Sequence, residues 1–600
     1  MQEKFASLRN LKFLLYEMFD VESLTKYPYF KEHSRGIFDM VLDTGMKIGR
    51  EIMLPYLSEM DKNPPEFKNG KVKVHPAVKL LMKECGKGGW IGAHTDYDLG
   101  GQQMPGMVMS AFRFVLSAAN YSASVYPFLT SGASHLITSF GSKELIDAYI
   151  PKMFSGEWGG TMALTEPQAG SSLTDITTIA VPTDDGYYKI KGQKIFISNP
   201  EHDGVENVVN LLLARIKDAP LGIKGMSLFV VPKLRPVKDL GLENNDVLCT
   251  SIYHKLGYHG SVLTQLSLGE NNDCRGWLVG EPNRGLKYMF QMMNEARIEV
   301  GMGAAAIASA AYYASLKYTK ERLQGRKITS RDPTQPQIPI IEHADIKRML
   351  LFQKAVVEGS LSLAMQCAQY VDLIRVLNSE EKEKYELLLE ILTPVTKSYP
   401  SEMGVLSVSQ GLQCLGGYGY CDEFPLEQYY RDIRIHPIHE GTTGIQGMDL
   451  LGRKVVMKQG KAAMTYIREI MGTIEEGKKI EELAVEVKKL EFAIGKLQDV
   501  TQHLTGLAIG GEIELFLADA TLYLEFFGII TIAWQWLKQA IVAKKSLSDN
   551  PSESDANFYQ GKLWTFRYFF NYELPKIEGL AIRLKNTDGL TLKMKSEYFD

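Results

Sequence analysis

One glutamate, Glu440, lies in a local sequence that suits proton chemistry. It is followed by a glycine and two threonines in HEGTTG and has few carboxylates near it in the sequence. A carboxylate can act as a general base when burial raises its pKa toward neutrality. A single glutamate is nevertheless more often a solvated surface residue. Glu440 therefore indicates proton abstraction only if other segments of the chain support it.

Two further segments stand out, and the first has a composition that suits a flat, phosphorylated ligand. In TMALTEPQAGSSLTDI (161–176), Glu-Pro is followed by a turn of small residues. Such a turn exposes backbone N–H groups and lets the chain approach a ring closely, although an ordinary polar turn has the same composition. The second segment, KIFISN (194–199), is an apolar strand. Strand geometry predicts that Phe196 and Ser198 share one face.

The elements that must position these segments change along the chain. Apolar residues recur at helical spacing from 37 to 157, which predicts helices. From Gly159 onward, short branched runs are set off by Gly, Pro, Asn or Asp, which predicts strands. Helical patterning returns after Pro282 and continues through an amphipathic tail beyond Gly460. The order is helical, β, helical and helical again.

In this order, the three segments resemble the signatures of the acyl-CoA dehydrogenase flavoproteins. Intervening motifs fit as well: HKLGYHGS, GWLVGEPNRGL and LQCLGGYGYCDEFPLEQYYRD. The resemblance runs from about residue 89 to residue 454 without a break in order. PIIEHADIKRML and the tail FFGIITIAWQWLKQA resemble the branch of roughly 600 residues. That branch includes 3-methylmercaptopropionyl-CoA dehydrogenases and some long-chain acyl-CoA dehydrogenases.

The resemblance implies an α+β multidomain fold. We expect a helical N-terminal domain (1–158), a central β-barrel domain (159–283), a four-helix bundle that carries the glutamate (284–460) and an added helical C-terminal domain (461–600). It also implies a homodimer or homotetramer, because some of the expected flavin contacts cross a subunit boundary in the family.

The implied reaction is FAD-dependent α,β-dehydrogenation of an acyl-CoA thioester to the trans-2-enoyl-CoA, as in β-oxidation. Glu440 would remove the α-proton, flavin N5 would accept the β-hydride, and an electron-transferring flavoprotein would take the electrons. Some relatives hold the base on a helix just before an arginine. That position is Ala296 here, which has no acid–base group, and the neighbouring Glu295 points about 100° away on a helix.

The resemblance assigns contacts residue by residue. The oxyanion of the thioester would meet the Glu440 backbone N–H in the family's arrangement. The residues matched to flavin contacts are Met162, Leu164, Thr165, Ser171, Phe196, Ile197, Ser198, Arg322, Gln324, Gln413, Gly416, Gly417 and Thr442. The residues matched to the substrate are Ser171, Asn294, Arg297, Gly441, His439, Tyr126 and Thr130, and no metal ligand is expected.

Three positions depart from the family pattern. His439 stands where a tyrosine usually precedes the glutamate, so it could bind a polar acyl group, shift the pKa of Glu440, or simply pack as an aromatic ring. Gly444 replaces a common flavin-contacting glutamine. Thr130 stands where some medium-chain relatives have a bulky glutamate that closes the acyl tunnel. The smaller side chain predicts a medium-to-long or bulky acyl group in preference to butyryl.

Two rival functions share parts of this pattern. An acyl-CoA oxidase would run the same half-reaction with oxygen as acceptor. A flavin-containing relative that binds DNA would require a basic patch, which a net charge of −4 and a pI near 6.3 do not favour. Six cysteines without ligand spacing, and an N-terminus without an apolar leader, predict a reduced cytoplasmic protein. Phe526–Leu537 is shorter than the roughly 20 residues of a membrane span, so we expect a buried helix.

Overall fold

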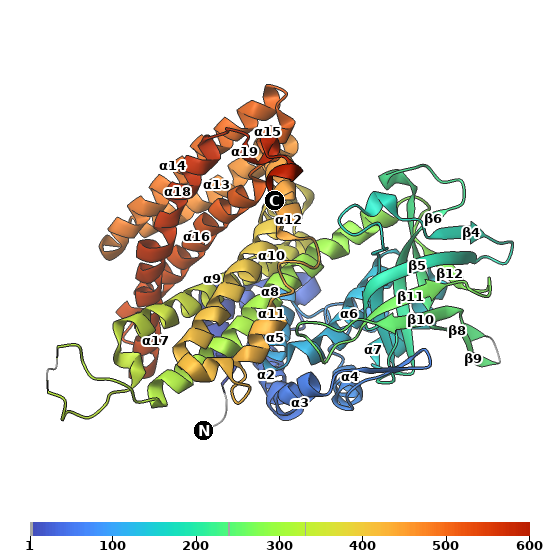
Figure 1. Cartoon of the computed structure of the whole chain (residues 1–600), viewed down its shortest axis with the longest axis horizontal. Coiled ribbons are helices and arrows are strands. Elements are labelled where there is room, and N and C mark those ends of the chain that lie inside the picture. The colour runs from blue at the N-terminus through green and yellow to red at the C-terminus, as the bar shows by residue number, and fades with distance from the viewer. Residues whose placement is uncertain (1–3, 238–239, 330–331) are drawn as a thin grey trace. The chain divides into compact units, whose positions relative to one another are not determined.

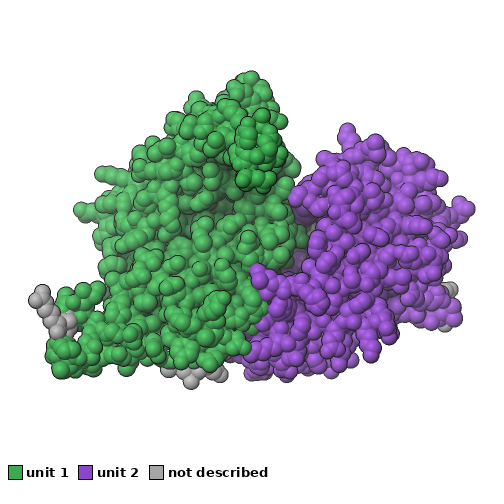
Figure 2. All heavy atoms as spheres, viewed as in Figure 1, with its two compact units in different colours: residues 1–27, 297–600 green, residues 28–296 purple. Residues whose placement is uncertain are grey.

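The chain divides by its internal contacts into two compact units. The structure is a computed structural model that describes residues 4–237, 240–329 and 332–600. One unit contains residues 28–296, and the other joins residues 1–27 to residues 297–600, as coloured in Figure 2. This division differs from the four segments expected from the sequence, whose boundaries remain a prediction.

The first part of the 28–296 unit is helical. A short hairpin of β1 (Glu66–Lys68) and β2 (Lys71–Lys73) interrupts the helices. Asn120 begins α6 as its N-cap, with its side-chain oxygen accepting a hydrogen bond from the Ala123 N–H. The helices are α2 (Arg35–Ile48), α3 (Leu57–Lys62), α4 (Ala77–Lys87), α5 (Gly106–Ala119), α6 (Tyr121–Phe140) and α7 (Lys143–Phe154).

The second part of this unit is a barrel. Strand β4 pairs with both β5 and β6, so β5, β12, β7, β6 and β4 form a closed ring. Strand β3 extends the ring beside β6, β11 and β10 extend it beside β5, and β8 and β9 form a separate hairpin (Figure 1). The strands are β3 (Trp158–Ala163), β4 (Ile179–Pro182), β5 (Tyr188–Ser198), β6 (Asn207–Ile216), β7 (Met226–Pro232), β8 (Leu234–Val237), β9 (Gly241–Asn244), β10 (Val247–Ile252), β11 (Leu263–Leu268) and β12 (Arg275–Val279).

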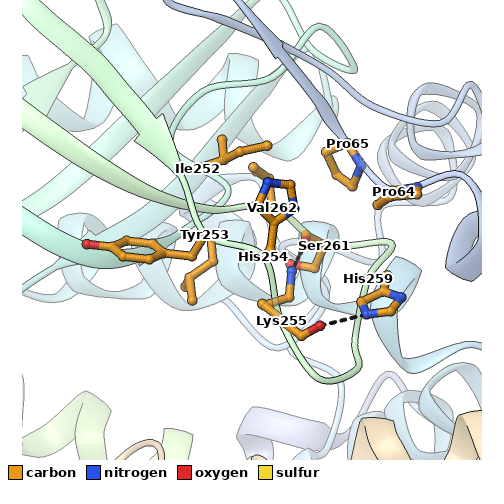
Figure 3. Close-up of a pocket in the computed structure, with 10 residues that line it drawn as sticks. Pro64, Pro65, Ile252, Tyr253, His254, Lys255, His259, Ser261 and Val262 are labelled. Carbon is orange, nitrogen blue, oxygen red and sulfur yellow. Dashed lines mark hydrogen bonds between the residues drawn. The ribbon is translucent and has the colours of Figure 1, made fainter.

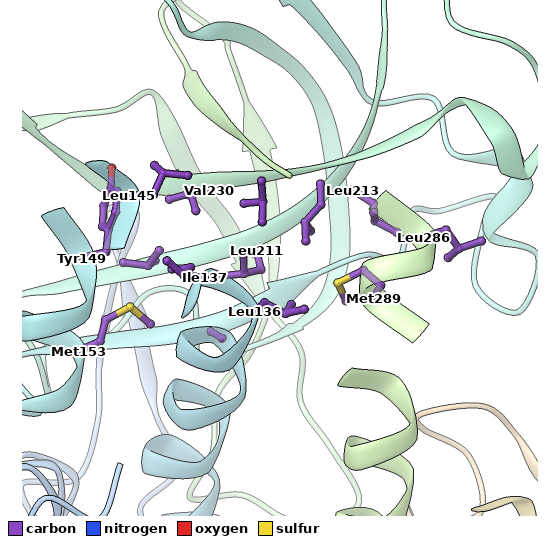
Figure 4. Packing of buried hydrophobic residues seen from close by; sticks show 14 of the residues in the cluster. Leu136, Ile137, Leu145, Tyr149, Met153, Leu211, Leu213, Val230, Leu286 and Met289 are labelled. Carbon is purple, nitrogen blue, oxygen red and sulfur yellow. The ribbon is translucent and has the colours of Figure 1, made fainter. Parts of the chain in front are cut away.

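A hydrophobic core joins the helices of this unit to the barrel. Apolar side chains from α6 and α7 meet side chains from β6 and β7, together with the first turns of α8 (Gly285–Glu321) (Figure 4). Leu136, Leu211 and Met289 are each at most 2% exposed. Burying a side chain of this size contributes about 1.5–3 kcal/mol. This core fixes β3, and with it the segment that follows at residue 164.

The other unit consists of helices joined by loops, with one isolated β-bridge, Leu323 to Pro339, among its described residues. From Arg297 onward α8 belongs to it, and α9 and α10 pack along each other. Residues 5–27 also pack here: Arg9 Nε donates to Asp555 Oδ1 at 2.8 Å, and Lys562 Nζ donates to Asn10 Oδ1 at 2.5 Å. Its helices include α1 (Leu8–Lys12), α9 (Ala344–Val376), α10 (Ser379–Leu415), α11 (Leu426–Ile433), α12 (Thr443–Asp449) and α13 (Met457–Gly477).

The C-terminal helices surround one very apolar helix, α16 (Ala520–Ser548). It contacts α9, α10, α12, α13 and α14, and 89% of its most apolar window is buried inside the protein. At 29 residues it is long enough to cross a membrane, so the length argument made from the sequence was wrong, but the expected buried helix is confirmed. The other helices are α14 (Ala484–Ile509), α15 (Ile513–Leu517), α17 (Glu553–Tyr568), α18 (Ile577–Lys585) and α19 (Leu590–Lys593).

Candidate active site

Glu440 lies in a strained turn between α11 and α12. Its φ of 54° is in the left-handed region, which a residue with a side chain occupies at a cost of about 1–2 kcal/mol. Gly441 follows with φ 88°, and a Cβ there would lie 2.5 Å from Gln446 Nε2. Thr442 is the N-cap of α12, its hydroxyl accepting a hydrogen bond from the Ile445 N–H at 3.3 Å. A strained non-glycine residue held by its surroundings is typical of functional sites.

Gln446 holds this turn and was not identified from the sequence. The side chain is fully buried, and its Nε2 donates to the carbonyl oxygens of Glu440 at 3.2 Å and Gly441 at 3.5 Å. Thr443, the next residue after the cap, donates from its hydroxyl to Glu402 on α10. No sequence spacing identifies these contacts, because both depend on how the turn folds back onto its own helix and onto α10.

The charge environment of Glu440 contains two cations. Burial raises the pKa of Glu440, whereas the positive charges of Arg297 and Lys397 lower it, and the net pKa is raised. Arg297 lies on α8, is 5% exposed and donates to Asp449 Oδ2 at 3.3 Å. This is the balance expected of a base whose pKa must lie closer to neutrality than that of a solvated carboxylate.

His439 lies next to Glu440 as a neutral ring. Burial, followed by the charges on His436 and Lys397, lowers the pKa of His439 well below its usual value. Its ring packs edge-to-face against His436 with a centroid separation of 5.3 Å. Because it is uncharged at neutral pH, His439 cannot act on Glu440 as a cation. Packing and hydrogen bonding to a ligand remain as its possible contributions.

In the 28–296 unit, the turn that contains Ser171 is anchored by Glu166. Lys194 on β5 donates to Glu166 Oε1 at 2.8 Å, and both side chains are at most 1% exposed. Glu166 Oε2 also accepts from the Thr177 N–H at 2.6 Å. The Ile195 N–H donates to the Thr165 carbonyl at 2.9 Å, so the chain after β3 is tied to β5. Met162, Leu164 and Thr165 are half-buried along this segment, and Ser171 is exposed.

Phe196 projects from β5 where the strand is irregular. Its φ is 55°, and β5 has an extra residue opposite β11 between Lys194 and Ile197. The bulge interrupts the regular alternation, so the strand argument that placed Phe196 and Ser198 on one face was incomplete. Phe196 is 54% exposed and packs on Tyr253 at a centroid separation of 4.7 Å. Ile197 is 2% exposed, which leaves only its main chain for contact with a ligand.

A small hollow of about 170 Å³ adjoins Tyr253 (Figure 3). Two of its polar side chains, those of His259 and Lys255, are already engaged. His259 Nε2 bonds to the Lys255 carbonyl at 2.8 Å and its Nδ1 lies 2.9 Å from Asp61, while Lys255 Nζ donates to the Ser261 carbonyl at 2.5 Å. Four residues of the motif HKLGYHGS line this hollow, and the bonds of His259 and Lys255 stabilise the loop that they belong to.

A larger hollow of about 680 Å³ lies in the other unit, at the ends of α8 and α10. It brings together five residues that the sequence assigned to the flavin. Gly416 has φ 59°, and a Cβ at Gly416 or Gly417 would meet no atom within 4 Å, so an approaching ligand would find open space there. The five assigned residues are Arg322, Gln324, Gln413, Gly416 and Gly417.

The residues assigned to the acyl pocket contact the barrel. Tyr126 donates from its hydroxyl to the Gly260 carbonyl at 3.1 Å. Thr130 is fully buried, donates to the Tyr126 carbonyl at 2.8 Å and accepts from the Gly160 N–H at 3.1 Å. Asn294 is half-buried on α8. The structure therefore groups Glu440, Gly441, Thr442, His439 and Arg297 in one unit, and Met162, Leu164, Thr165, Phe196 and Ser198 in the other.

Comparison with known families accounts for most of the chain. Residues 39–157, 161–270 and 283–455 match the N-terminal, middle and C-terminal domains of acyl-CoA dehydrogenase. Residues 466–595 match a domain described as acetyl-CoA dehydrogenase C-terminal like.

Individual relatives extend over almost the full length. The chain is 35% identical to a butyryl-CoA dehydrogenase of Syntrophomonas wolfei, covering 99% of this chain and 98% of the relative. It is 35% identical to 3-methylmercaptopropionyl-CoA dehydrogenase of Ruegeria pomeroyi, covering 95% and 97%. The fold matches acyl-CoA dehydrogenase complexed with FAD from Bacillus anthracis at a TM-score of 0.71 and 22% identity, covering 98% and 93%. This chain is therefore a member of the acyl-CoA dehydrogenase family.

Proposed function

We propose that this enzyme removes the α-proton and a β-hydride from an acyl-CoA thioester to give the trans-2-enoyl-CoA, with Glu440 as the base. The observation that carries the proposal is the combination at Glu440 of a left-handed backbone and a burial that raises its pKa. The first is backbone strain of the kind that is found at functional sites. The second makes that carboxylate a stronger base than one in water.

The chain's own groups would perform the proton transfer. Glu440 takes the α-proton, and the charge that develops on the thioester oxygen is met by the Glu440 backbone N–H. Gln446 fixes that backbone through its two bonds to the turn carbonyls. Asn294 and Arg297 are assigned to the thioester and CoA side, and His439 to the acyl side. Gly441 is assigned to the substrate as well.

Features of each unit, taken by itself, support the two sets of residues assigned to FAD. The open space around Gly416 and Gly417 and the projecting, half-exposed Phe196 are features that a bound cofactor would cover. When bound, the flavin supplies the acceptor for the β-hydride. The residues that would hold it are Met162, Leu164, Thr165, Ser171, Phe196, Ile197, Ser198, Arg322, Gln324, Gln413, Gly416, Gly417 and Thr442.

We also propose that this enzyme forms an oligomer and passes electrons to a second protein. Tyr418, which lines the larger hollow, is 45% exposed, and Tyr420, two residues further along, is 97% exposed. Their exposure supports a homodimer or homotetramer that covers them. Electrons would pass to an electron-transferring flavoprotein rather than to oxygen. Named relatives act on butyryl-CoA and 3-methylmercaptopropionyl-CoA, so both thioesters belong in a substrate panel with longer and bulkier ones.

The base is tested by Glu440→Gln, with Glu295→Gln as the matched control. We expect Glu440→Gln to keep its flavin and lose about 100- to 10,000-fold in kcat, the usual contribution of a positioned base. Glu295, which is bonded to His135 at 2.9 Å, should be replaceable with little loss. Near-normal turnover by a flavin-replete Glu440→Gln enzyme would overturn the proposal.

The acceptor is tested by measuring hydrogen peroxide and enoyl-CoA together in air. We expect enoyl-CoA to accumulate only when an electron-transferring flavoprotein or an artificial acceptor is added. Peroxide formed in step with enoyl-CoA would identify an oxidase instead.

A further inference from the structure

Lys397 on α10 differs from the other buried lysines of its unit. It is fully buried, and its Nζ has no hydrogen-bond partner among the described residues. Lys562 and Lys454, also buried in this unit, each donate to a carboxylate, Glu358 and Glu390 respectively. An ammonium group buried without a carboxylate contact is costly, so its retention calls for a specific reason.

The backbone around Lys397 is held closely against α8. A Cβ at Gly301 would lie 1.8 Å from the Thr396 carbonyl oxygen and 3.2 Å from Lys397 Cα, so only a glycine permits this crossing. Arg297 precedes Gly301 by four residues and therefore lies one turn away on the same face of α8. The crossing thus places Lys397 beside the face of α8 that carries Arg297. It also explains why residue 301, to which no flavin contact is assigned, is a glycine.

Charged groups from three elements act on Lys397. Burial lowers its pKa to about 8, the charges of Glu402 on α10 and Glu440 in the turn raise it, and Arg297 on α8 lowers it. His436 and His439 also face it from the turn, and burial, together with the charge of Lys397, lowers the pKa of both. Asp449 on α12 is bonded to Arg297, which offsets part of that cation. At neutral pH, Lys397 is thus a cation among neutral imidazoles and carboxylates.

We propose that Lys397 is a positioning residue that acts through Glu440, its buried charge keeping that carboxylate ionised before substrate arrives. The inference rests on Glu440 being the base. Burial alone would favour the protonated form of Glu440, which cannot accept the α-proton, and Lys397 adds its charge to that of Arg297 against this effect. Because Lys397 makes no bond to a carboxylate of the part of the chain that the structure describes, its charge can act on Glu440 without occupying the oxygen that takes the proton.

The test is the pH profile of kcat/KM, which reports ionisations of the free enzyme. In Lys397→Met we expect the acid limb to move up by about one pH unit, which gives roughly tenfold lower activity at pH 6 and recovery toward the wild-type level near pH 9. Lys397→Arg should restore the wild-type limb. Lys538→Met is the matched control, because burial also lowers the pKa of Lys538 to about 8 while its Nζ bonds to Gln366. Its acid limb should not move.

The outcomes separate the two proposals. An unmoved acid limb in Lys397→Met, or equal loss at every pH through inactivation or misfolding, overturns the role of Lys397. An equal shift in Lys538→Met overturns it as well, since any buried lysine would then suffice. Glu440→Gln should be inactive across the whole pH range. Turnover by that variant would instead remove the base assignment itself.

Discussion

Glu440 and Glu166 are both glutamates in crowded surroundings next to cations, yet their pKa values move in opposite directions. Burial would raise the pKa of Glu166, but the charge of Lys194 and hydrogen bonds lower it to about 2. For Glu440, burial outweighs Arg297 and Lys397, and the pKa is raised. The difference lies in direct donors. Glu166 accepts from Lys194, Thr177, Thr178 and Gln168, whereas Arg297 and Lys397 act on Glu440 through their charges.

This comparison separates an anchor from the proposed base. A carboxylate that accepts several hydrogen bonds is stabilised as an anion and has little affinity for a proton. A crowded carboxylate with few donors retains affinity for a proton and is free to move toward a substrate. A glutamate with low proton affinity therefore fixes the turn of Ser171, whereas a glutamate with raised proton affinity lies in the turn of Glu440.

Removing the anchor should have the largest effect on stability. Glu166→Gln leaves the buried Lys194 without its counter-charge, which typically costs about 3–5 kcal/mol. We expect a lower urea midpoint and poor flavin retention. Glu157→Gln is the control, because it breaks an ion pair with Lys152 in the same unit whose side chains are 48–49% exposed. Equal midpoints for the two variants would contradict the anchor role.

Acid should weaken the same anchor. The folded pKa of Glu166 is about 2, whereas an unfolded glutamate has a pKa of about 4.3. A lowered folded pKa contributes stability that is present above pH 4.3 and is lost as the pH falls toward 2. The loss amounts to about 3 kcal/mol. Unfolding midpoints measured from pH 6 to pH 3 should fall for the wild type and fall less steeply for Glu166→Gln.

Loosening the Glu440 turn should reduce turnover without unfolding the enzyme. Gln446→Met removes the two amide bonds to the carbonyls of Glu440 and Gly441. If the loss of these bonds raises the activation free energy by about 1.4 kcal/mol, kcat falls roughly tenfold. KM and flavin content should change little. An unchanged kcat would show that the cap at Thr442 alone defines the turn.

We also expect the ionised Glu440 side chain to lower the free energy of unfolding. A raised folded pKa means that the charged form of Glu440 is disfavoured in the native state, so this contribution to stability rises as the pH falls. Glu440→Gln removes the charge, and we expect about 1 kcal/mol of added stability at pH 7.5, the usual scale when a functional group is neutralised. The gain should shrink at pH 5, and a midpoint below that of the wild type at pH 7.5 would contradict this reading.

Local patterns predicted the strands and the turn around Glu166, because the branched runs after Gly159 and the small residues after Glu-Pro were read from neighbouring residues alone. The Glu-Gly-Thr turn at Glu440 came from the family resemblance, and its left-handed backbone was not predicted. Gln446 and Lys397 were missed because their contribution depends on contacts that the fold creates. Phe196 was assigned correctly as a residue of a strand, but a bulge opposite β11 interrupts the regular alternation of faces at this residue.

Helix length and long-range packing were also beyond local reasoning. The apolar run at Phe526–Leu537 was taken as the whole helix, whereas α16 continues through polar residues to Ser548 because α13, α14 and α17 cover it. Residues 5–27 pack with the C-terminal helices through Asn10 and Lys562, a pairing across more than 500 positions. Periodicity does not record contacts at that separation.

The smallest effect is expected at Thr130, where the sequence placed the end of the acyl tunnel. Its hydroxyl links the Tyr126 carbonyl to the Gly160 N–H, and a Cβ at Gly160 would come within 3.2 Å of Thr130 Cα, so α6 lies directly on β3 at this point. Thr130→Val, which keeps the shape and removes the hydroxyl, should lower the unfolding free energy by about 1 kcal/mol. Thr130→Ser should be neutral, and both variants should retain the wild-type order of kcat/KM across acyl chain lengths.

Thr130→Glu would force a charge between helix and strand, so it should reduce the yield of folded, flavin-bound protein. A soluble Thr130→Glu enzyme that prefers shorter acyl groups would place this side chain at the acyl group after all.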